Sequence, residues 1–350
     1  MLLLNMKHFI ILLAAGAMLL SGCTEDSPVT VRPEGSDEPA VEIDRNAFAK
    51  GADVSWITQL EYEGFTFANQ AGEQKECMAL LRDDCGVNAI RLRVWVNPEE
   101  GWNNIHDVAV KARRADNLGL RLMIDFHFSD TWADPGAQIT PAAWADMELP
   151  ELKAAMTAHI NEMLNTLKNL DITPEWVQIG NETRGGMMYP LGAVDAHFAE
   201  LVDAGYTAVK AIFPDAKVIV HLDCGNEPGL YTYVFDDLTA KGAKYDMIGM
   251  SLYPEPADWQ QLVTDCLANV RAVNAKYGKR VVIAEIGMDY READAADAMM
   301  RAMVKGCTEA GVVDGIFWWE PEAPASKGYL KGCFDEGVPT KALAVFKETN

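Results

Sequence analysis

Two glutamates in this chain stand where apolar runs give way to loops. Glu182 follows the run EWVQIG at 175–180, and Glu285 lies near the end of the run RVVIAEIG at 280–287. If both runs are parallel strands of one barrel, their carboxyl ends meet at the same rim. Two carboxylates at one rim can flank a bond in a ligand and divide the roles of proton donor and nucleophile.

Amide and aromatic side chains accompany the two glutamates. Asn181 directly precedes Glu182 and is placed to bond a sugar hydroxyl near the reacting centre. Trp318 and Trp319 in the run DGIFWWE predict a stacking floor, and Trp132 lies in the polar loop DTWADPG. An aromatic ring on a polar loop commonly stacks on a sugar or another apolar face. The alternative for Trp132 is a cap on the end of the barrel.

Charged residues alternate with apolar ones in two further runs. Because strand side chains alternate between faces, Arg91, Arg93 and Trp95 share one face of their run. Asp125 and His127 share one face of another run. Arginines inside a barrel are costly unless paired, which predicts an acid-rich pocket near the strand ends. Each of these residues also has a structural alternative. The arginines could form ion pairs that close the end of the barrel, and His127 could be a buried core histidine.

The rest of the chain alternates short apolar runs with amphipathic segments. The runs lie at 51–54, 88–95, 120–128, 175–180, 217–222, 246–253, 280–287 and 314–320. Apolar residues recur at three- and four-residue spacing in the segments 151–170, 196–213 and 294–311, which predicts helices. Strand alternating with helix predicts an α/β protein with a parallel sheet. Eight such units in 350 residues predict a single (β/α)₈ barrel, a TIM barrel.

The first 45 residues predict an export signal and a tether. Residues 1–22 hold no acidic residue and end in Leu-Ser-Gly before Cys23. This ending resembles a bacterial lipoprotein box, which implies cleavage before Cys23 and lipidation of its thiol; ordinary secretion is the alternative. Residues 23–45 are acidic and proline-containing and predict a flexible tether. The folded domain is expected over 46–350, held by lipid at a bacterial outer membrane, cell surface or periplasm.

Net charge indicates which partners are unfavourable, and chain size bears on whether the cysteines form disulfides. The sequence has 52 acidic and 30 basic residues and a net charge of −22, so nucleic acid and anionic membrane surfaces are poor partners. We expect the lipid to be the one link to a membrane. A chain of this size needs no disulfide to hold its core. Apart from Cys23, the cysteines are predicted to be free and mostly buried thiols.

Several motifs together resemble one family of glycosidases. An Asn-Glu pair after the fourth run, a glutamate in the seventh and aromatics in the eighth resemble the retaining (β/α)₈ enzymes of clan A. More narrowly, the stretches 53–61, 90–98, 125–144, 178–182 and 284–287 resemble glycoside hydrolase family 53. The resemblance runs from about Lys50 to the end of the chain. It implies an endo-β-1,4-galactanase acting on type I arabinogalactan and the galactan side chains of pectin.

The resemblance also implies roles for individual residues. Glu182 is expected to be the general acid/base and Glu285 the nucleophile. Carried over by motif, the central subsite is lined by Asp53, Arg93, His127, Asn181, His221, Tyr253 and Trp318. The residues themselves add Trp95, Asp125, Trp132 and Trp319 as substrate contacts. Phe128 stands where many relatives have tyrosine, which removes one possible hydroxyl contact.

The expected enzyme is a monomer that needs no cofactor for catalysis. Some members of the family hold calcium in the loops after the seventh and eighth strands. Acids occur there in this chain, without a spacing that matches a ligand set, so the metal is left open: Asp289, Glu292, Asp294, Glu322 and Asp335.

A retaining double displacement sets two expectations on the geometry. The two carboxyl groups should lie about 5 to 5.5 Å apart, because an inverting enzyme leaves about 6.5 to 9.5 Å for a water molecule. Glu285 should be ionised, with Arg93 and Tyr253 as its expected partners, and Glu182 should keep its proton. Two alternatives stay open. One is another clan A specificity, such as a mannanase, cellulase or arabinofuranosidase; the other is a surface glycan-binding lipoprotein without activity.

Overall fold

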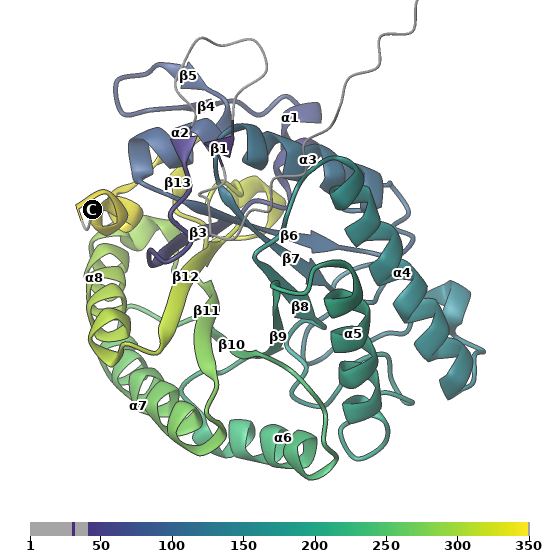
Figure 1. The fold of residues 1–350 in the computed structure, drawn as a ribbon. Coiled ribbons are helices and arrows are strands. Elements are labelled where there is room, and N and C mark those ends of the chain that lie inside the picture. The colour runs from purple at the N-terminus through teal and green to yellow at the C-terminus, as the bar shows by residue number, and fades with distance from the viewer. Residues whose placement is uncertain (1–29, 32–40, 349–350) are drawn as a thin grey trace, which may run out of the picture.

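The computed structural model describes residues 30–31 and 41–348. Within them, eight parallel strands close into a barrel (Figure 1). The barrel strands are β3 (Ala49–Asp53), β6 (Ala89–Val94), β7 (Arg121–Phe126), β8 (Trp176–Ile179), β9 (Lys217–Leu222), β10 (Met247–Leu252), β11 (Arg280–Ile286) and β12 (Val313–Trp319). The barrel closes where β12 pairs in parallel with β3. The predicted α/β class and single TIM barrel are confirmed.

Helices surround the barrel and connect its strands (Figure 1). From β6 to β12, one long helix lies between each strand and the next: α3 (Ile105–Asn117), α4 (Leu149–Asn169), α5 (Phe198–Ile212), α6 (Pro228–Ala240), α7 (Trp259–Tyr277) and α8 (Ala293–Ala310). The segment between β3 and β6 holds α1 (Ile57–Tyr62) and α2 (Cys77–Cys85), and α9 (Ala344–Glu348) follows β12. The predicted helices at 151–170, 196–213 and 294–311 correspond to α4, α5 and α8.

Short elements lie in the loops between the main ones. Antiparallel pairs form between β1 (Thr30–Val31) and β2 (Val41–Glu42), β4 (Phe67–Ala68) and β5 (Gln74–Lys75), and β13 (Phe334–Asp335) and β14 (Val338–Pro339). Single 3₁₀ turns span Ala142–Trp144, Tyr290–Glu292, Ala325–Lys327 and Lys341–Leu343.

The alternation of side chains along the strands separates two cores. Outward-facing residues such as Ile90, Leu92 and Val94 pack in a large core between the strands and the helices. Every barrel strand also contributes to a smaller inner core, formed by Ala49, Ala89, Met123, Trp176, Ile219, Met247, Val282, Ala284 and Phe317. The inner core fills the lower part of the barrel, so the polar inward-facing residues are confined to the carboxyl ends of the strands.

The six described cysteines are free thiols. Five of them are buried and Cys224 is partly exposed, which confirms the prediction of mostly buried thiols. Residues 1–22 and the proposed lipidation site Cys23 lie outside the described residues. Within the described ranges, we find no helix with the length and apolar character needed to span a membrane.

Candidate active site

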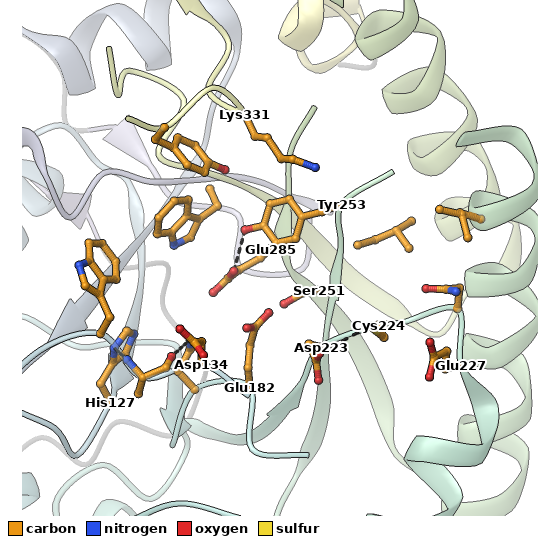
Figure 2. A pocket seen from close by; sticks show the side chains of 18 residues that line it. His127, Asp134, Glu182, Asp223, Cys224, Glu227, Ser251, Tyr253, Glu285 and Lys331 are labelled. Atoms are coloured by element: carbon orange, nitrogen blue, oxygen red, sulfur yellow. Dashed lines mark hydrogen bonds between the residues drawn. The ribbon is translucent and has the colours of Figure 1, made fainter. Parts of the chain in front are cut away.

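A turn and a bulge bring the two strand-end glutamates into one pocket (Figure 2). After β8, Gly180 and Glu182 take left-handed backbone angles, with φ of +81° and +47°. A Cβ at Gly180 would lie 2.6 Å from the Thr183 side chain, so this turn requires glycine. In β11 the pairing with β10 skips Ala284. Because of this β-bulge, Glu285 points into the pocket although Ala284, the residue before it, already lies in the inner core.

Arg91 carries the positive charge beneath this pocket. Its fully buried guanidinium lies 2.8 Å from Asp53, 2.8 Å from Asp125 and 3.0 Å from Glu285. Burial alone would lower the pKa of Arg91, but the three carboxylates raise it above its ordinary value. Arg91 therefore stays charged and combines a structural ion-pair role with direct contact to Glu285.

Arg93, in contrast, does not reach Glu285. Its guanidinium bonds Glu320 and lies over the ring of Trp132, with 4.3 Å from Cζ to the ring centroid. The expectation that Arg93 keeps Glu285 ionised is wrong. The two arginines share a face of β6, but Glu320, which follows β12, pairs with Arg93 and leaves Arg91 as the cation that contacts Glu285.

The pKa values of the two glutamates are set by different surroundings. Burial, followed by the nearby charge of Glu285, raises the pKa of Glu182 well above its ordinary value. Burial raises the pKa of Glu285 only to about 7, because Arg91 and the Tyr253 hydroxyl favour its charged form. Tyr253 donates to Glu285 at 2.7 Å. Figure 2 marks this hydrogen bond with a dashed line. The pocket can thus supply one protonated acid and one carboxylate near neutral pH.

A hydrogen-bonded group of neutral side chains supports Glu182. Ser251 bonds the Glu182 carboxyl and so opposes the effect of burial on its pKa. The Ser251 hydroxyl lies 2.8 Å from His221 Nε2, and His221 Nδ1 lies 2.9 Å from Asn181 Oδ1. Burial lowers the pKa of His221 well below its ordinary value, so the imidazole is uncharged at neutral pH. This group orients Glu182 without placing a cation beside it.

His127 is oriented by contacts on both ring nitrogens. Trp95 Nε1 and the backbone N–H of Ala133 donate to His127 Nδ1 at 3.1 and 3.3 Å. Nδ1 is therefore the acceptor, and Nε2–H donates to Asp125 at 3.0 Å. His127 is 3% exposed and still lines the pocket. It is both a satisfied core histidine and a group that a ligand would meet.

The structure brings seven of the expected residues together at a pocket of about 630 Å³, a volume ordinary for ligand sites. They are His127, Trp132, Asn181, Glu182, Tyr253, Glu285 and Trp319. A second set is buried and does not line the pocket: Asp53, Arg93, Trp95, Asp125 and His221. These residues hold the lining in place through the ion pairs and hydrogen bonds described above.

Trp318 lies outside the pocket. It is fully buried in the core between strands and helices, where its indole N–H donates to the Lys331 carbonyl at 3.1 Å. The expected floor of two tryptophans is therefore wrong for Trp318, because strand alternation turns just one of two adjacent side chains inward. Trp319 is the one that faces the pocket, and its ring centroid lies 5.7 Å from that of Trp132.

One wall of the pocket consists of residues that were not predicted from the sequence. Asp223 and Cys224 after β9, with Glu227 further along, line the pocket beside Glu182 (Figure 2). Arg184 Nε donates to Asp223 at 2.8 Å and fixes this wall. Asp223 directly follows the run KVIVHL, so the strand-end rule that singled out Glu182 would also have found it.

The other missed lining residues had weaker signals in the sequence. Ser251 shares the inward face of its run with Tyr253 and could have been found by alternation. Tyr329 and Lys331 come from the irregular segment after β12, and no periodicity marks them. Asn226, Leu252 and Leu262 also contribute to the lining.

The acids after β11 and β12 do not gather around a common point. Asp289 pairs with Arg291, and Asp294 pairs with Lys341. Glu322 is buried beside Glu320. Among residues 41–348, we find no group of histidines, cysteines or acids with the arrangement of a metal site. The acids after β11 and β12 thus do not form a metal site among their own side chains.

Comparisons with known proteins agree with this geometry. A model of glycosyl hydrolase family 53 matches residues 49–311. A probable arabinogalactan endo-β-1,4-galactanase A of Aspergillus terreus is 33% identical over 317 residues, which cover 82% of this chain and 89% of the relative. An endo-β-1,4-galactanase of Bacillus subtilis is 29% identical over 360 residues, with coverage of 90% and 82%.

Two solved structures share the architecture over most of the chain. A structure from a study of two fungal β-1,4-galactanases has a TM-score of 0.80 and 28% identity, and covers 86% of this chain and 100% of that one. The catalytic domain of a family 53 protein from Ignisphaera aggregans has a TM-score of 0.77 and 26% identity, with coverage of 92% and 99%. The barrel, the glutamate pair in its mouth and the family match lead to one conclusion: the chain belongs to glycosyl hydrolase family 53 and is a glycoside hydrolase.

Proposed function

We propose that this protein is an endo-acting β-1,4-galactanase that cleaves type I arabinogalactan and pectic galactan with retention of anomeric configuration. The observation that carries the proposal is the pair Glu182 and Glu285 in one pocket. It is supported by an environment that raises the pKa of Glu182 well above its ordinary value, while Arg91 and Tyr253 favour the charged form of Glu285. The names of the relatives support galactan as the substrate. Trp132 and Trp319 in the lining offer ring faces on which a pyranose can stack. The enzyme acts as a monomer and without a cofactor.

In the first half of the reaction, the Glu285 carboxylate attacks the anomeric carbon of the bound galactosyl unit. The bond from this carbon to the glycosidic oxygen breaks, and the leaving oxygen takes the proton of Glu182. The product is a galactosyl ester of Glu285. Arg91 and Tyr253, both within 3.0 Å of the Glu285 carboxyl, orient it for the attack.

In the second half, Glu182 is a carboxylate and takes a proton from a water molecule as the water attacks the anomeric carbon. The ester bond breaks and Glu285 returns as a carboxylate, which Arg91 and Tyr253 stabilise as a leaving group. Two inversions at one carbon give overall retention. Ser251 and His221 keep Glu182 oriented through the exchange of protons.

The test of substrate and stereochemistry uses the purified enzyme on a panel of polysaccharides. Linear β-1,4-galactan should be cut into oligosaccharides, whereas mannan, xylan and cellulose should be left intact. Proton NMR of the first galactan product should show the β-anomer. Cleavage of mannan or cellulose in preference to galactan would assign another specificity. Initial release of the α-anomer would show inversion and remove the nucleophile role from Glu285.

The roles of the two glutamates are separable with azide. Glu285→Ala should lose turnover, and added azide should restore reaction on an activated aryl galactoside with an α-galactosyl azide as product. Glu182→Ala should keep activity on substrates with good leaving groups, and azide should then give the β-azide. Glu309→Gln is the matched control, because Glu309 is an exposed residue of α8. The opposite pairing of azide products would exchange the two roles.

We also propose that the enzyme is exported and anchored by a lipid on Cys23 after removal of residues 1–22. The support is the Leu-Ser-Gly-Cys ending of the apolar N-terminal stretch. Cys23→Ala should move the protein from the membrane fraction to the soluble fraction or stall its processing. Ser27→Ala, four residues further on, is the control. Unchanged fractionation of Cys23→Ala would contradict the lipid anchor.

A further inference from the structure

A pair of aromatic residues, the exposed Tyr62 and the partly exposed Trp102, lies outside the residues that line the pocket. Tyr62, the last residue of α1, is 81% exposed. Its ring centroid lies 5.5 Å from that of Trp102, with an angle of 51° between the ring planes. Single apolar side chains on a surface are common, but two adjacent rings that both reach solvent form a contact surface with a definite shape.

The chain connections place this pair on the same face of the barrel as the pocket. Helix α1 starts a few residues after Asp53, the carboxyl end of β3. Trp102 lies in the connection from the carboxyl end of β6 to the start of α3. Figure 1 shows α1 beside α3 at the outer edge of the barrel. Both rings therefore belong to the rim around the active-site face.

Helix α1 links the pair to the aromatic lining of the pocket. Trp56, directly before α1, has its ring centroid 5.4 Å from that of Trp132 and 6.3 Å from that of Trp319. Both of these tryptophans line the pocket. Tyr62 lies six positions after Trp56, which is about 9 Å along a helix. This short segment thus carries, at one end, a ring in contact with the tryptophans of the pocket and, at the other end, the exposed ring of Tyr62.

The chemistry of the pair fits a neutral polysaccharide. A galactopyranose ring has an apolar face of C–H groups that stacks on aromatic rings, and stacking of this kind is insensitive to charge. The net charge of −22 disfavours an acidic partner. We propose that Tyr62 and Trp102 form a distal galactan-binding site that holds the polymer outside the pocket while another part of the same chain is cleaved. This inference rests on the proposed galactanase function.

The experiment compares polymer with short oligosaccharides. Tyr62→Ala, Trp102→Ala and the double variant are assayed on long β-1,4-galactan and on short β-1,4-galacto-oligosaccharides that fill only the pocket. The double variant should raise KM for the polymer about 3- to 10-fold, as expected for the loss of aromatic contacts. It should leave kcat/KM for the short substrates unchanged. Tyr233→Ala is the matched control, because Tyr233 is an aromatic residue of α6 that is 56% exposed.

Binding without turnover gives a second readout. In a Glu285→Gln background, soluble galactan in a native gel should retard the protein with intact Tyr62 and Trp102 more than the double variant. Equal retardation and equal polymer KM would overturn the distal site. So would an equal loss on short and long substrates, because the pair would then support the pocket itself. If light scattering shows that the double variant converts a dimer into a monomer, the pair is a self-association surface and the inference is wrong.

Failure of the distal site and failure of the proposed function give different results. A wild-type enzyme that neither cleaves nor binds galactan refutes the galactanase function and the site that depends on it. A wild-type enzyme that cleaves galactan, with a double variant that matches it on every substrate, refutes the distal site alone. Because Tyr62 is so exposed, Tyr62→Ala is expected to fold normally and keeps the test decisive if Trp102→Ala is unstable.

Discussion

Arg91 Nη1 lies 3.0 Å from Glu285 Oε1 and 2.8 Å from Asp53 Oδ2, with all three side chains almost completely removed from solvent. Asp125 completes the group, 2.8 Å from Nη2 of the same guanidinium. One cation is thus shared among three carboxylates. Since burial alone would keep Glu285 protonated, the charge of Arg91 decides how readily the proposed nucleophile ionises.

Arg91→Lys should slow the enzyme and change its pH dependence. Lysine keeps a positive charge but cannot contact three carboxylates with a planar fork. We expect kcat to fall about 100-fold or more. Arg91 lowers the pKa of Glu285, so a weaker contact raises that pKa and moves the acidic limb of the kcat/KM profile to higher pH. Arg113→Lys on the surface of α3 is the control. An acidic limb that does not move would contradict this role for Arg91.

Ser251→Ala should shift the alkaline limb of the same profile. The bond from Ser251 lowers the pKa of Glu182, so its loss raises that pKa, and Glu182 then keeps its proton to higher pH. We expect kcat to fall about 10-fold because Glu182 loses an orienting hydrogen bond. Ser251→Thr, which keeps the hydroxyl, should restore most of the activity. A loss of activity with an unchanged alkaline limb would indicate a packing role alone.

The fold and the glutamate pair were predictable because they depend on hydrophobic periodicity and on position at strand ends. Both features can be read from the sequence without knowing how the side chains pack. The eight apolar runs and the amphipathic segments between them fix a parallel barrel. Because Glu182 and Glu285 lie at the ends of two of these runs, both are expected at the carboxyl-end rim of the barrel. Strand alternation also predicts correctly that Arg91 and Asp125 face inward while Ile90 packs outside.

The wrong predictions concern two kinds of feature. One is the choice between adjacent residues of a strand, of which one faces inward; the other is the ion-pair partner of a charged residue, which lies far away in the chain. Alternation applied to the pair Trp318 and Trp319 allows just one inward ring, and the sequence does not say which. Arg91 and Arg93 share a face, and the choice between them depends on Glu320, which lies more than two hundred residues away in the chain. The bulge at Ala284 has no signature in the sequence, yet it turns Glu285 into the pocket.

Glu322→Gln should make the protein's stability less sensitive to rising pH. Burial and the charge of Glu320 raise the pKa of Glu322 well above its ordinary value of 4.5. The folded state therefore binds this proton more tightly than the unfolded state. The resulting stability is fully present below about pH 4.5 and is lost as pH rises toward the folded pKa.

Urea unfolding at pH 5 and pH 8 measures this effect. The free energy of unfolding of the wild type should fall between the two values by about 1 kcal/mol or more relative to Glu322→Gln. Glu309→Gln, a change at an exposed glutamate, should follow the wild type. If Glu322→Gln shows the same loss of stability as the wild type, Glu322 is ionised in the folded protein, and burial does not hold its proton.

Cys224 should act as a reporter of pocket occupancy. It is the partly exposed cysteine among residues 41–348, it lines the pocket, and its thiol lies 3.1 Å from Arg184 Nη2. Burial raises its pKa to about 11, so the reactive thiolate is scarce at neutral pH. We expect slow maleimide labelling of the native protein, confined to Cys224 and to Cys23 when that residue carries no lipid.

Three measurements check this expectation. Labelling should speed up with pH, because more thiolate forms, and should stop in Cys224→Ser. Galacto-oligosaccharides added to a Glu285→Gln background should slow it, since Cys224 and Glu182 face the same cavity. Denaturation without reductant should expose six thiols in the lipidated protein and seven in protein with a free Cys23. Labelling that ligand does not slow would place bound substrate away from Cys224, and a count below six would reveal a disulfide that the structure lacks among its described cysteines.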